Sequence, residues 1–284
     1  MRRYELNDTQ WSVISDLFPC SSDRGRPRRD DRTLLNAIFW MLCSGAAWRD
    51  LPERYGPWQT AYDRFSEWKQ AGLFDQILRH LHLRLDAQEL IDLDTWMVDA
   101  TSIRASKQAA GARKKKDDPS DQALGRSRGG LTTKIHMLCD SHGIPLAVDV
   151  FAGHRQESTQ LETLLASVSI PQQRGRSRCR PKQLLADKGY DIPQLRRNLR
   201  KRGIRPGIPL KAVGKNRQRR QKGPRPHFDR VCYQQRNVIE RLIGWLKEQR
   251  RIAMRFEKKA SHFLAMVKLA GIRQMMKTYF SDTA

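Results

Sequence analysis

The sequence predicts an α/β protein in two parts: an all-helical N-terminal region over residues 1–91, and a mixed five-stranded sheet flanked by helices over residues 92–284. Two observations lead to this prediction. The first part carries apolar residues at helical spacing between turn signals, and the second alternates short apolar runs with further helical patterns. With 39% hydrophobic residues, the chain has enough apolar material to form a core.

Four helices are expected in the N-terminal region. Asn7 or Asp8 can cap the first, which carries Trp11, Ile14 and Leu17 on one face. The same spacing of apolar residues predicts the other three, over residues 32–44, 60–70 and 74–86. Three or four short helices with basic surfaces are typical of a small DNA-binding module.

A basic loop, RGRPRRDDR, joins the first two helices over residues 24–32. Its Arg24, Arg26 and Arg28 are candidate DNA contacts, because a narrow A·T-rich minor groove attracts arginine by its enhanced negative potential. The alternative is a solvated loop that contacts only phosphate groups.

The second part begins with a buried strand, TWMVDA (95–100), followed by a long polar loop over residues 104–130. The later elements are strands over 131–140, 144–152, 183–187 and 204–210, and helices over 157–168, 192–202, 238–250 and 262–280. The first two of these strands form a hairpin. The resulting order of strand, strand, strand, helix, strand, helix, strand, helix is that of a ribonuclease H-like fold.

The charge balance predicts a polyanionic partner. Lys and Arg number 54 against 30 Asp and Glu, a formal net charge of +24. A surplus this large repels itself in the compact state, and binding a polyanion offsets the repulsion by releasing counterions. Nucleic acid is the leading candidate, and charge alone permits a structural RNA-binding protein as well as a DNA-binding one. An anionic membrane surface is the rival, but no basic amphipathic helix stands alone.

No membrane partner is expected, since no apolar run approaches the ~18 residues of a membrane span and no signal peptide is evident. The five cysteines are scattered and odd in number, which predicts a reduced, cytoplasmic chain. His136, Cys139 and His142 have a spacing that can suggest zinc. No second ligand pair follows them, so we interpret them as strand and turn residues.

Two acids are expected to lie close together. Asp99 ends the first predicted strand and Asp187 ends the fourth. If the hairpin is antiparallel and the following crossover is right-handed, these strands run parallel and present their acids at the same end. Two neighbouring carboxylates repel unless a cation lies between them, and all-oxygen ligands suit Mg²⁺ or Mn²⁺. The pattern therefore predicts a divalent metal site.

A third acid lies on a predicted amphipathic helix with the sequence YQQRNVIERLIGWLK, residues 233–247. At ~100° per residue, Tyr233, Arg236, Glu240 and Lys247 fall within about 60° of one another, opposite the apolar face. A metal-binding carboxylate beside phosphate-binding cations is what a DNA-cleaving site needs. The alternative is an ordinary surface helix with an Arg236–Glu240 pair.

The spacing of these four residues resembles the Y-R-E-K signature of DDE-class bacterial insertion-sequence transposases of the family five/four type. Further segments resemble the motifs of this family in the same order along nearly the whole chain. They are GRPRRDDR, WRDLPERYGPW, VDATSIRA around Asp99, GRSRGGLTTKIH, and LLADKGYD around Asp187.

The resemblance implies a ribonuclease H-like fold in which Asp99, Asp187 and Glu240 bind the catalytic ions, two Mg²⁺ or Mn²⁺ per site. Tyr233, Arg236 and Lys247 would then contact or position DNA phosphates. The implied activity is cleavage at terminal inverted repeats, followed by attack of the freed 3′-hydroxyl on target DNA. The protein would act as a homodimer that holds two element ends.

The chain departs from the resemblance in one region. Relatives with a large inserted domain carry it between the second acid and the glutamate, whereas here a basic loop over residues 211–230 stands in its place. We expect this loop to order when DNA binds.

Several other residues are weaker candidates. His154 and Arg155 follow the third strand and are expected near the acids, either as DNA contacts or as solvated loop residues. Lys188 and Tyr190 are weak candidates for phosphate contact. His136 points either into the core or toward the acids. The runs 174–180 and 196–205 are expected to be solvated basic faces that can extend a DNA footprint, and Trp96 and Trp245 are expected in the core.

Three other functions remain open at this point. A nuclease of the same fold would cut but never join, and a strand-transfer assay separates the two. A non-catalytic DNA-binding regulator would have no need of three carboxylates in register. A structural RNA-binding protein would show neither metal dependence nor preference for duplex ends.

Overall fold

A mixed sheet lies at the centre of the computed structural model, which describes residues 3–19, 28–111, 122–127, 130–211 and 228–281. The strands run in the order β2-β3-β1-β5-β6, with β4 paired to β3 and β7 paired to β1. Their bounds are β1 (Thr95–Ala105), β2 (Gly125–Ser127), β3 (Gly130–Asp140), β4 (Pro145–Ala152), β5 (Gln183–Leu185), β6 (Arg205–Gly207) and β7 (Met254–Arg255).

The order of the five predicted strands is confirmed. β3 pairs antiparallel with both β1 and β4, and β5 pairs parallel with β1 and β6. This is the ribonuclease H-like arrangement. The two additional strands, β2 and β7, contain three and two residues and extend the sheet where β1 and β3 project beyond the others.

The prediction that the first strand ends at Asp99 and Ala100 is wrong. β1 continues to Ala105 and stays paired with β3 as far as Arg104. The apolar run ends because this part of β1 is buried on one face only, at Ile103, while Ser102 and Arg104 are exposed. Asp99 therefore lies in the middle of a long strand. Part of the predicted loop over residues 104–130 is likewise structured, as β2 and the short helix η4 (Lys107–Gly111).

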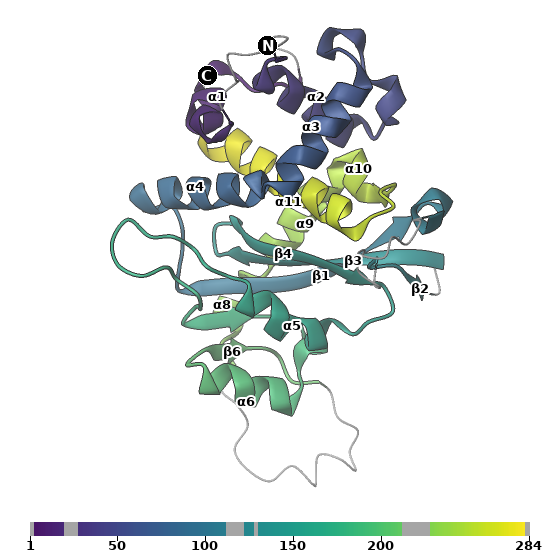
Figure 1. Ribbon diagram of the computed structural model, residues 1–284. Helices are drawn as coiled ribbons and strands as arrows, with labels where there is room; N and C mark the ends of the chain where they lie inside the picture. Colours follow the sequence, from purple (N-terminus) through teal and green to yellow (C-terminus); the bar gives the residue numbers. More distant parts are fainter. Residues whose placement is uncertain (1–2, 20–27, 112–121, 128–129, 212–227, 282–284) are drawn as a thin grey trace.

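Helices cover the sheet on both sides. Those of the N-terminal region are α1 (Asp8–Ile14), η1 (Ser15–Leu17), α2 (Asp31–Ser44), η2 (Trp48–Asp50), η3 (Glu53–Tyr55), α3 (Trp58–Gln70) and α4 (Leu73–Ala87). Those that follow are α5 (Glu157–Ala166), η5 (Lys188–Tyr190), α6 (Pro193–Lys201), α8 (Arg230–Gln234), α9 (Asn237–Glu248), α10 (Arg250–Ala253) and α11 (Ala260–Tyr279). Figure 1 shows the N-terminal helices at one end of the molecule and α6 at the other.

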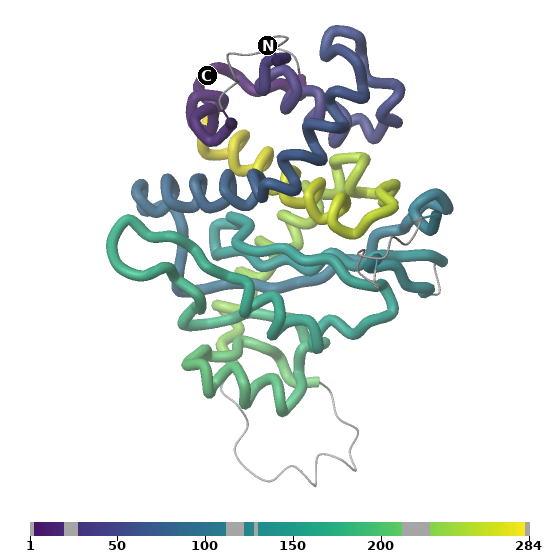
Figure 2. The backbone as a smooth tube through the Cα atoms, viewed as in Figure 1, coloured from purple at the N-terminus to yellow at the C-terminus, as the bar shows by residue number. Residues whose placement is uncertain are grey.

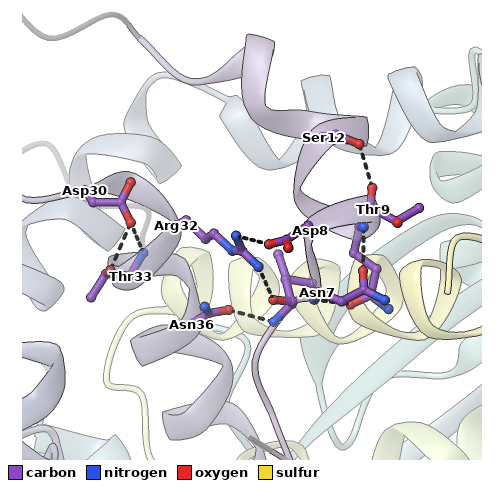
Figure 3. A network of polar contacts seen from close by, with 10 residues as sticks. Asn7, Asp8, Thr9, Ser12, Asp30, Arg32, Thr33 and Asn36 are labelled. Atoms are coloured by element: carbon purple, nitrogen blue, oxygen red, sulfur yellow. Dashed lines mark hydrogen bonds and ion pairs between the residues drawn. The ribbon is translucent and has the colours of Figure 1, made fainter. Parts of the chain in front are cut away.

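Polar contacts fix the start of the N-terminal region (Figure 3). Asn7 caps α1 as predicted, in a capping box with Gln10. The Arg32 guanidinium on α2 donates to the Asp8 carboxylate at 2.6 Å and to the Leu6 carbonyl at 2.7 Å. These contacts hold α1 against α2.

The first and last helices of the chain lie side by side (Figure 2). The buried Gln10 side chain on α1 donates to the Met276 carbonyl at 3.2 Å and to the Ser281 hydroxyl at 2.7 Å. α11 also packs against α2, α3, α4 and β4. One cluster of buried apolar side chains therefore extends from the N-terminal helices to the sheet. The boundary between residues 91 and 92 stays a prediction from the sequence. Over the described ranges, no helix is both long and apolar enough to cross a membrane.

Candidate active site

Asp99 and Asp187 lie on neighbouring parallel strands. Met97 on β1 is paired with Leu185 on β5, so two residues further along each chain bring Asp99 and Asp187 beside each other. The Ala100 amide donates to the Asp99 carboxylate at 2.9 Å. Burial raises the pKa of Asp99, and the nearby charge of Asp187 raises it further, while Arg236 opposes both. The two acids therefore repel each other at one edge of the site.

Asp187 is held by a tight turn. Its carboxylate caps η5 and accepts a hydrogen bond from the Gly189 amide at 2.7 Å. A Cβ added at Gly189 would come within 2.7 Å of this carboxylate. The turn therefore needs glycine at this position to bring its backbone so close to the acid.

Arg236 joins Asp99 to the third acid. Its guanidinium lies 3.3 Å from an Asp99 oxygen and also donates to the Glu240 carboxylate. Burial disfavours the arginine charge, but Asp99, Tyr233 and Glu240 outweigh it and raise the pKa of Arg236. Its side chain is 14% exposed, against 54% for Glu240. The Arg236 guanidinium is thus fixed at the base of the site, and the Glu240 carboxylate is open to solvent.

The prediction of one continuous helix from Tyr233 to Lys247 is wrong. α8 ends at Gln234, α9 begins at Asn237, and Arg236 occupies the N-cap position. The amides of Val238 and Ile239 bond the carbonyls three residues back rather than four, which tightens the chain into a turn. Tyr233 therefore lies outside α9, although its ring stays 5.9 Å from the Arg236 guanidinium.

A buried histidine–tyrosine pair supports the Asp187 turn. Tyr190, the last residue of η5, is fully buried, and its hydroxyl lies 3.0 Å from His136 Nε2 on β3. The two rings stack at 6.0 Å. His136 therefore points into the core beside the acids. The prediction of Tyr190 as a phosphate contact is wrong, because it packs under the site. Nothing in its charged neighbourhood in the sequence indicates this burial.

Two other predicted cations, Lys188 and Lys247, lie on the same elements as two of the acids. Lys188 is exposed next to Asp187, and Lys247 is exposed about 10 Å along α9 from Glu240. Arg28 is paired with Glu67 on α3 at 3.4 Å. Arg24 and Arg26 lie outside the described residues, as does most of the basic loop 211–230.

His154 and Arg155 are not brought beside the acids. Both are exposed in the turn after β4, where Gly153 donates to the Thr132 carbonyl. Asp99 is paired with Met137, five residues further along β3, which is roughly 16 Å away along the strand. The expectation failed because β1 continues past Asp99. The end of β4, at Ala152, is therefore aligned through β3 with Ile103 and not with Asp99.

The carboxylates fit a divalent cation by chemistry. Three acids with only oxygen donors suit Mg²⁺ or Mn²⁺, and the repulsion between Asp99 and Asp187 is what a cation would relieve. Within the described residues, no three His, Cys, Asp or Glu side chains converge closely enough to hold a metal as they stand. Glu240 would complete the set by moving from Arg236.

His136 and Cys139 lie in β3 and His142 lies in the turn that follows, as interpreted from the sequence. His136 and Cys139 are buried, whereas His142 is exposed in the hairpin turn and lies 2.8 Å from the Leu90 carbonyl. Trp96 is buried as expected, but the expectation for Trp245 is wrong, because 45% of it is exposed. Ile239, Leu242, Ile243 and Leu246 already fill the buried face of α9.

Two family models match the chain. Residues 6–78 match "Putative transposase of IS4/5 family", and residues 93–275, more than half of the chain, match "Transposase DDE domain". The chain belongs to the transposase DDE domain family. As an insertion-sequence transposase of the DDE class, it is a nuclease and polynucleotidyl transferase that acts on DNA and depends on divalent metal ions.

Curated relatives cover different parts of this transposase. The "Uncharacterized protein y4sN" of Sinorhizobium fredii is 40% identical over 39% of this chain and 85% of its own length. The putative transposase for insertion sequence element IS402 of Burkholderia cepacia is 34% identical over 51% of this chain and 62% of its own. That for IS6501 of Brucella ovis is 30% identical over 49% of this chain and 95% of its own.

Solved structures of Mos1 complexes are distantly similar to the transposase. The Mos1 strand transfer complex has a TM-score of 0.25 and 14% identity, over 72% of this chain and 65% of that one. The Mos1 paired-end complex has a TM-score of 0.24 and 11% identity, over 81% and 82%. TM-scores this low do not establish a common fold, so the ribonuclease H-like assignment rests on the strand order and the family match.

Proposed function

We propose that this transposase cuts DNA at the terminal inverted repeats of an insertion sequence and joins the freed 3′-hydroxyl to target DNA, with Asp99, Asp187 and Glu240 as its catalytic residues. One observation carries the proposal: Asp99 and Asp187 lie beside each other on parallel strands, and Arg236 joins Asp99 to Glu240. Three acids distant in sequence thus surround one small region of the surface.

The three carboxylates would hold Mg²⁺ or Mn²⁺, two ions per site. Such ions activate an attacking oxygen and stabilise a leaving one in phosphoryl transfer. Asp99 and Asp187 form the fixed part of the ligand set, because one lies within a strand and the other in a capped turn. The exposed Glu240 side chain is the adjustable part.

The cations of the site would bind and orient DNA. The Arg236 guanidinium, held by Asp99 from below, presents a permanent charge to a phosphate. Lys188, next to Asp187, and Lys247, further along α9 than Glu240, are both exposed, and Tyr233 packs against Arg236. His154 and Arg155 would contact DNA further from the cut.

The N-terminal region over residues 1–91 would bind the inverted repeats, with Arg24, Arg26 and Arg28 in the contact. The active form would be a homodimer that holds two element ends in the bacterial cytoplasm, associated with the nucleoid. The net charge of +24 supports the proposal that the partner of this protein is DNA.

The test is cleavage and joining of labelled DNA that carries the element end, with Mg²⁺ or Mn²⁺. We would compare wild type with Asp99→Asn, Asp187→Asn and Glu240→Gln, and with Asp63→Asn on the exposed face of α3 as the matched control. We expect wild type and the control to cleave and join, while the three site variants bind DNA and do neither.

Two results would contradict the proposal. Full activity in any of the three site variants would show that the chemistry lies elsewhere. Cleavage by wild type without joining, under conditions in which a target duplex is bound, would leave a nuclease.

A further inference from the structure

The edge of the sheet beyond Asp187 carries a dense basic surface. Residues 174–211 include thirteen lysines and arginines but only two acids, both aspartates. We use the name α6 basic surface for four of its exposed members, which lie on α6 or are joined to its end: Arg180, Arg197, Arg200 and Lys201. None of these four has a described acid partner. Arg180 donates to the Arg202 carbonyl at 2.5 Å, which joins the loop before β5 to the end of α6.

Other cations in this segment have structural partners. Arg196 is buried and paired with Asp191 at 2.8 Å. Arg178 and Lys182 both contact Asp94, at 2.9 and 2.7 Å. The α6 basic surface has no comparable ion pairs among the residues that the structure describes. Its charge is therefore left to repel itself, a cost that a polyanion would remove.

The amide side chains of α6 are occupied within the protein. Gln194 donates to Asn198 at 2.9 Å, and Asn198 donates to Glu162 on α5 at 2.5 Å. Asparagine and glutamine are the usual readers of adenine, whereas cations are the usual partners of phosphate. The face left open therefore suits a DNA backbone of any sequence.

The position of the surface favours a second DNA molecule rather than the element end. α6 begins six residues after Asp187 and lies at the opposite end of the molecule from the N-terminal helices (Figure 1). A duplex on this surface would pass beside the acids without reaching the N-terminal region. A transposase that joins an element end to target DNA needs a surface that binds the target duplex. The target lacks the inverted repeat, so this surface need not read that sequence.

We propose that the α6 basic surface binds the phosphate backbone of the target duplex and holds it beside Asp187. This inference rests on the proposed cleavage and joining reaction. It adds that the two DNA molecules bind to different regions of the protein. The element ends would bind to the N-terminal region and the target duplex to the α6 basic surface.

The experiment neutralises three members together, in the variant Arg197→Gln/Arg200→Gln/Lys201→Gln. The matched control is Lys107→Gln/Lys258→Gln/Lys277→Gln, which removes the same charge from exposed positions elsewhere. Binding to a duplex without the element end is measured against salt concentration. Cleavage of an intact element end and joining of a pre-cut end to target DNA are measured separately.

We expect the α6 variant to lose about 2.7 from the slope of log affinity against log salt, as three phosphate contacts predict. Wild-type affinity should then fall roughly 40-fold more than the variant's between 50 and 200 mM salt. Joining of pre-cut ends should drop at low target concentration and recover as target is added. Cleavage of intact ends should stay at the wild-type rate, and the control should match wild type in all three assays.

Three outcomes would overturn the inference: an unchanged salt slope, an equal loss of cleavage and joining, or the same losses in the control variant. Failure of wild type to cleave would instead contradict the proposed function. The two failures are separable, because binding to a plain duplex is measured without any reaction.

Discussion

Tyr190 connects the folded core to the candidate site. Its hydroxyl is the described partner of His136 Nε2, and His136 Nδ1 is buried without a hydrogen-bond partner in the described structure. Tyr190→Phe would therefore leave the whole imidazole unsatisfied. We expect a loss of about 1–3 kcal/mol in the free energy of unfolding, measured by denaturant titration.

The matched control is Tyr62→Phe, whose hydroxyl has no described hydrogen bond and whose ring is half-buried. We expect it to change stability by less than about 0.5 kcal/mol. Equal effects of the two substitutions would show that the bond to His136 contributes nothing. Because Tyr190 ends the turn that Asp187 caps, Tyr190→Phe should also slow end cleavage.

His136 makes stability depend on pH. Burial, with a smaller contribution from Lys134, lowers its pKa to about 4. The unfolded chain binds the proton more tightly, so this contribution is complete above the unfolded pKa of about 6.5 and is lost as pH falls toward 4. Between pH 7 and 5, wild type should lose about 2 kcal/mol more than His136→Gln.

Denaturant titrations of both proteins at the two pH values check this difference. His262, whose pKa is also lowered to about 4, adds a similar loss to both proteins and cancels in the comparison. Parallel pH dependence in wild type and variant would show that His136 takes up no proton in this range.

The position of a residue is predicted well from the sequence when it follows from the direction of its strand. The burial of a residue is predicted less well, because it depends on which element packs over it. The proximity of Asp99 and Asp187 was predicted correctly because the two strands run parallel and pair just before these residues, although Asp99 does not end its strand. Tyr190 was misplaced because a tyrosine among charged residues has the pattern of a surface residue. Trp245 was misplaced because periodicity does not tell which element covers each part of a helix.

At the scale of elements, α9 contains a glycine that its geometry does not require. Gly244 lies in the helix interior, is exposed, and a Cβ added there would meet nothing within 4 Å. Gly244→Ala should therefore raise the free energy of unfolding by about 0.5–1 kcal/mol, through helix propensity alone. Thermal unfolding without DNA measures this gain.

Gly207→Ala in β6 is the comparison. There the added Cβ would come within 2.4 Å of Leu185 on β5, so stability should fall. A loss from Gly244→Ala would contradict the description of an open helix face. A gain in stability with a loss of cleavage would indicate that DNA approaches the helix at this glycine.

Strand order was predictable, and strand length was not. β1, β3, β4 and β5 are long or buried and have apolar patterns, whereas β2 and β7 are too short to show any period. The three residues of β6 were predicted from the apolar residues on either side of them. β1 was predicted too short because its second half is buried on one face only. The break between α8 and α9 was missed because the turn at Arg236 interrupts hydrogen bonding without interrupting the apolar pattern.

At the scale of the whole molecule, α11 completes the N-terminal region. It packs on α2, α3 and α4, and Gln10 bonds its last turn. A fragment of residues 1–91 would expose the apolar surface that α11 covers. We expect it to lack a cooperative thermal transition by circular dichroism, and to regain one when a peptide of residues 256–284 is added.

A cooperative transition in the fragment alone would support an independent domain that ends at residue 91, as predicted from the sequence. The amphipathic patterns of the N-terminal helices indicate that each has a buried face. They do not indicate that the element covering this face comes from the other end of the chain.

The side-by-side packing of α1 and α11 also determines when, during synthesis of the chain, the N-terminal region can fold completely. Chains emerge from the ribosome N-terminus first, so the helices over residues 8–87 are made long before α11. Until α11 has been made, their apolar faces lack the helix that covers them. A chain that lacks α11 would thus be unable to form the complete N-terminal region, so the DNA recognition proposed for that region would begin only once α11 has been made.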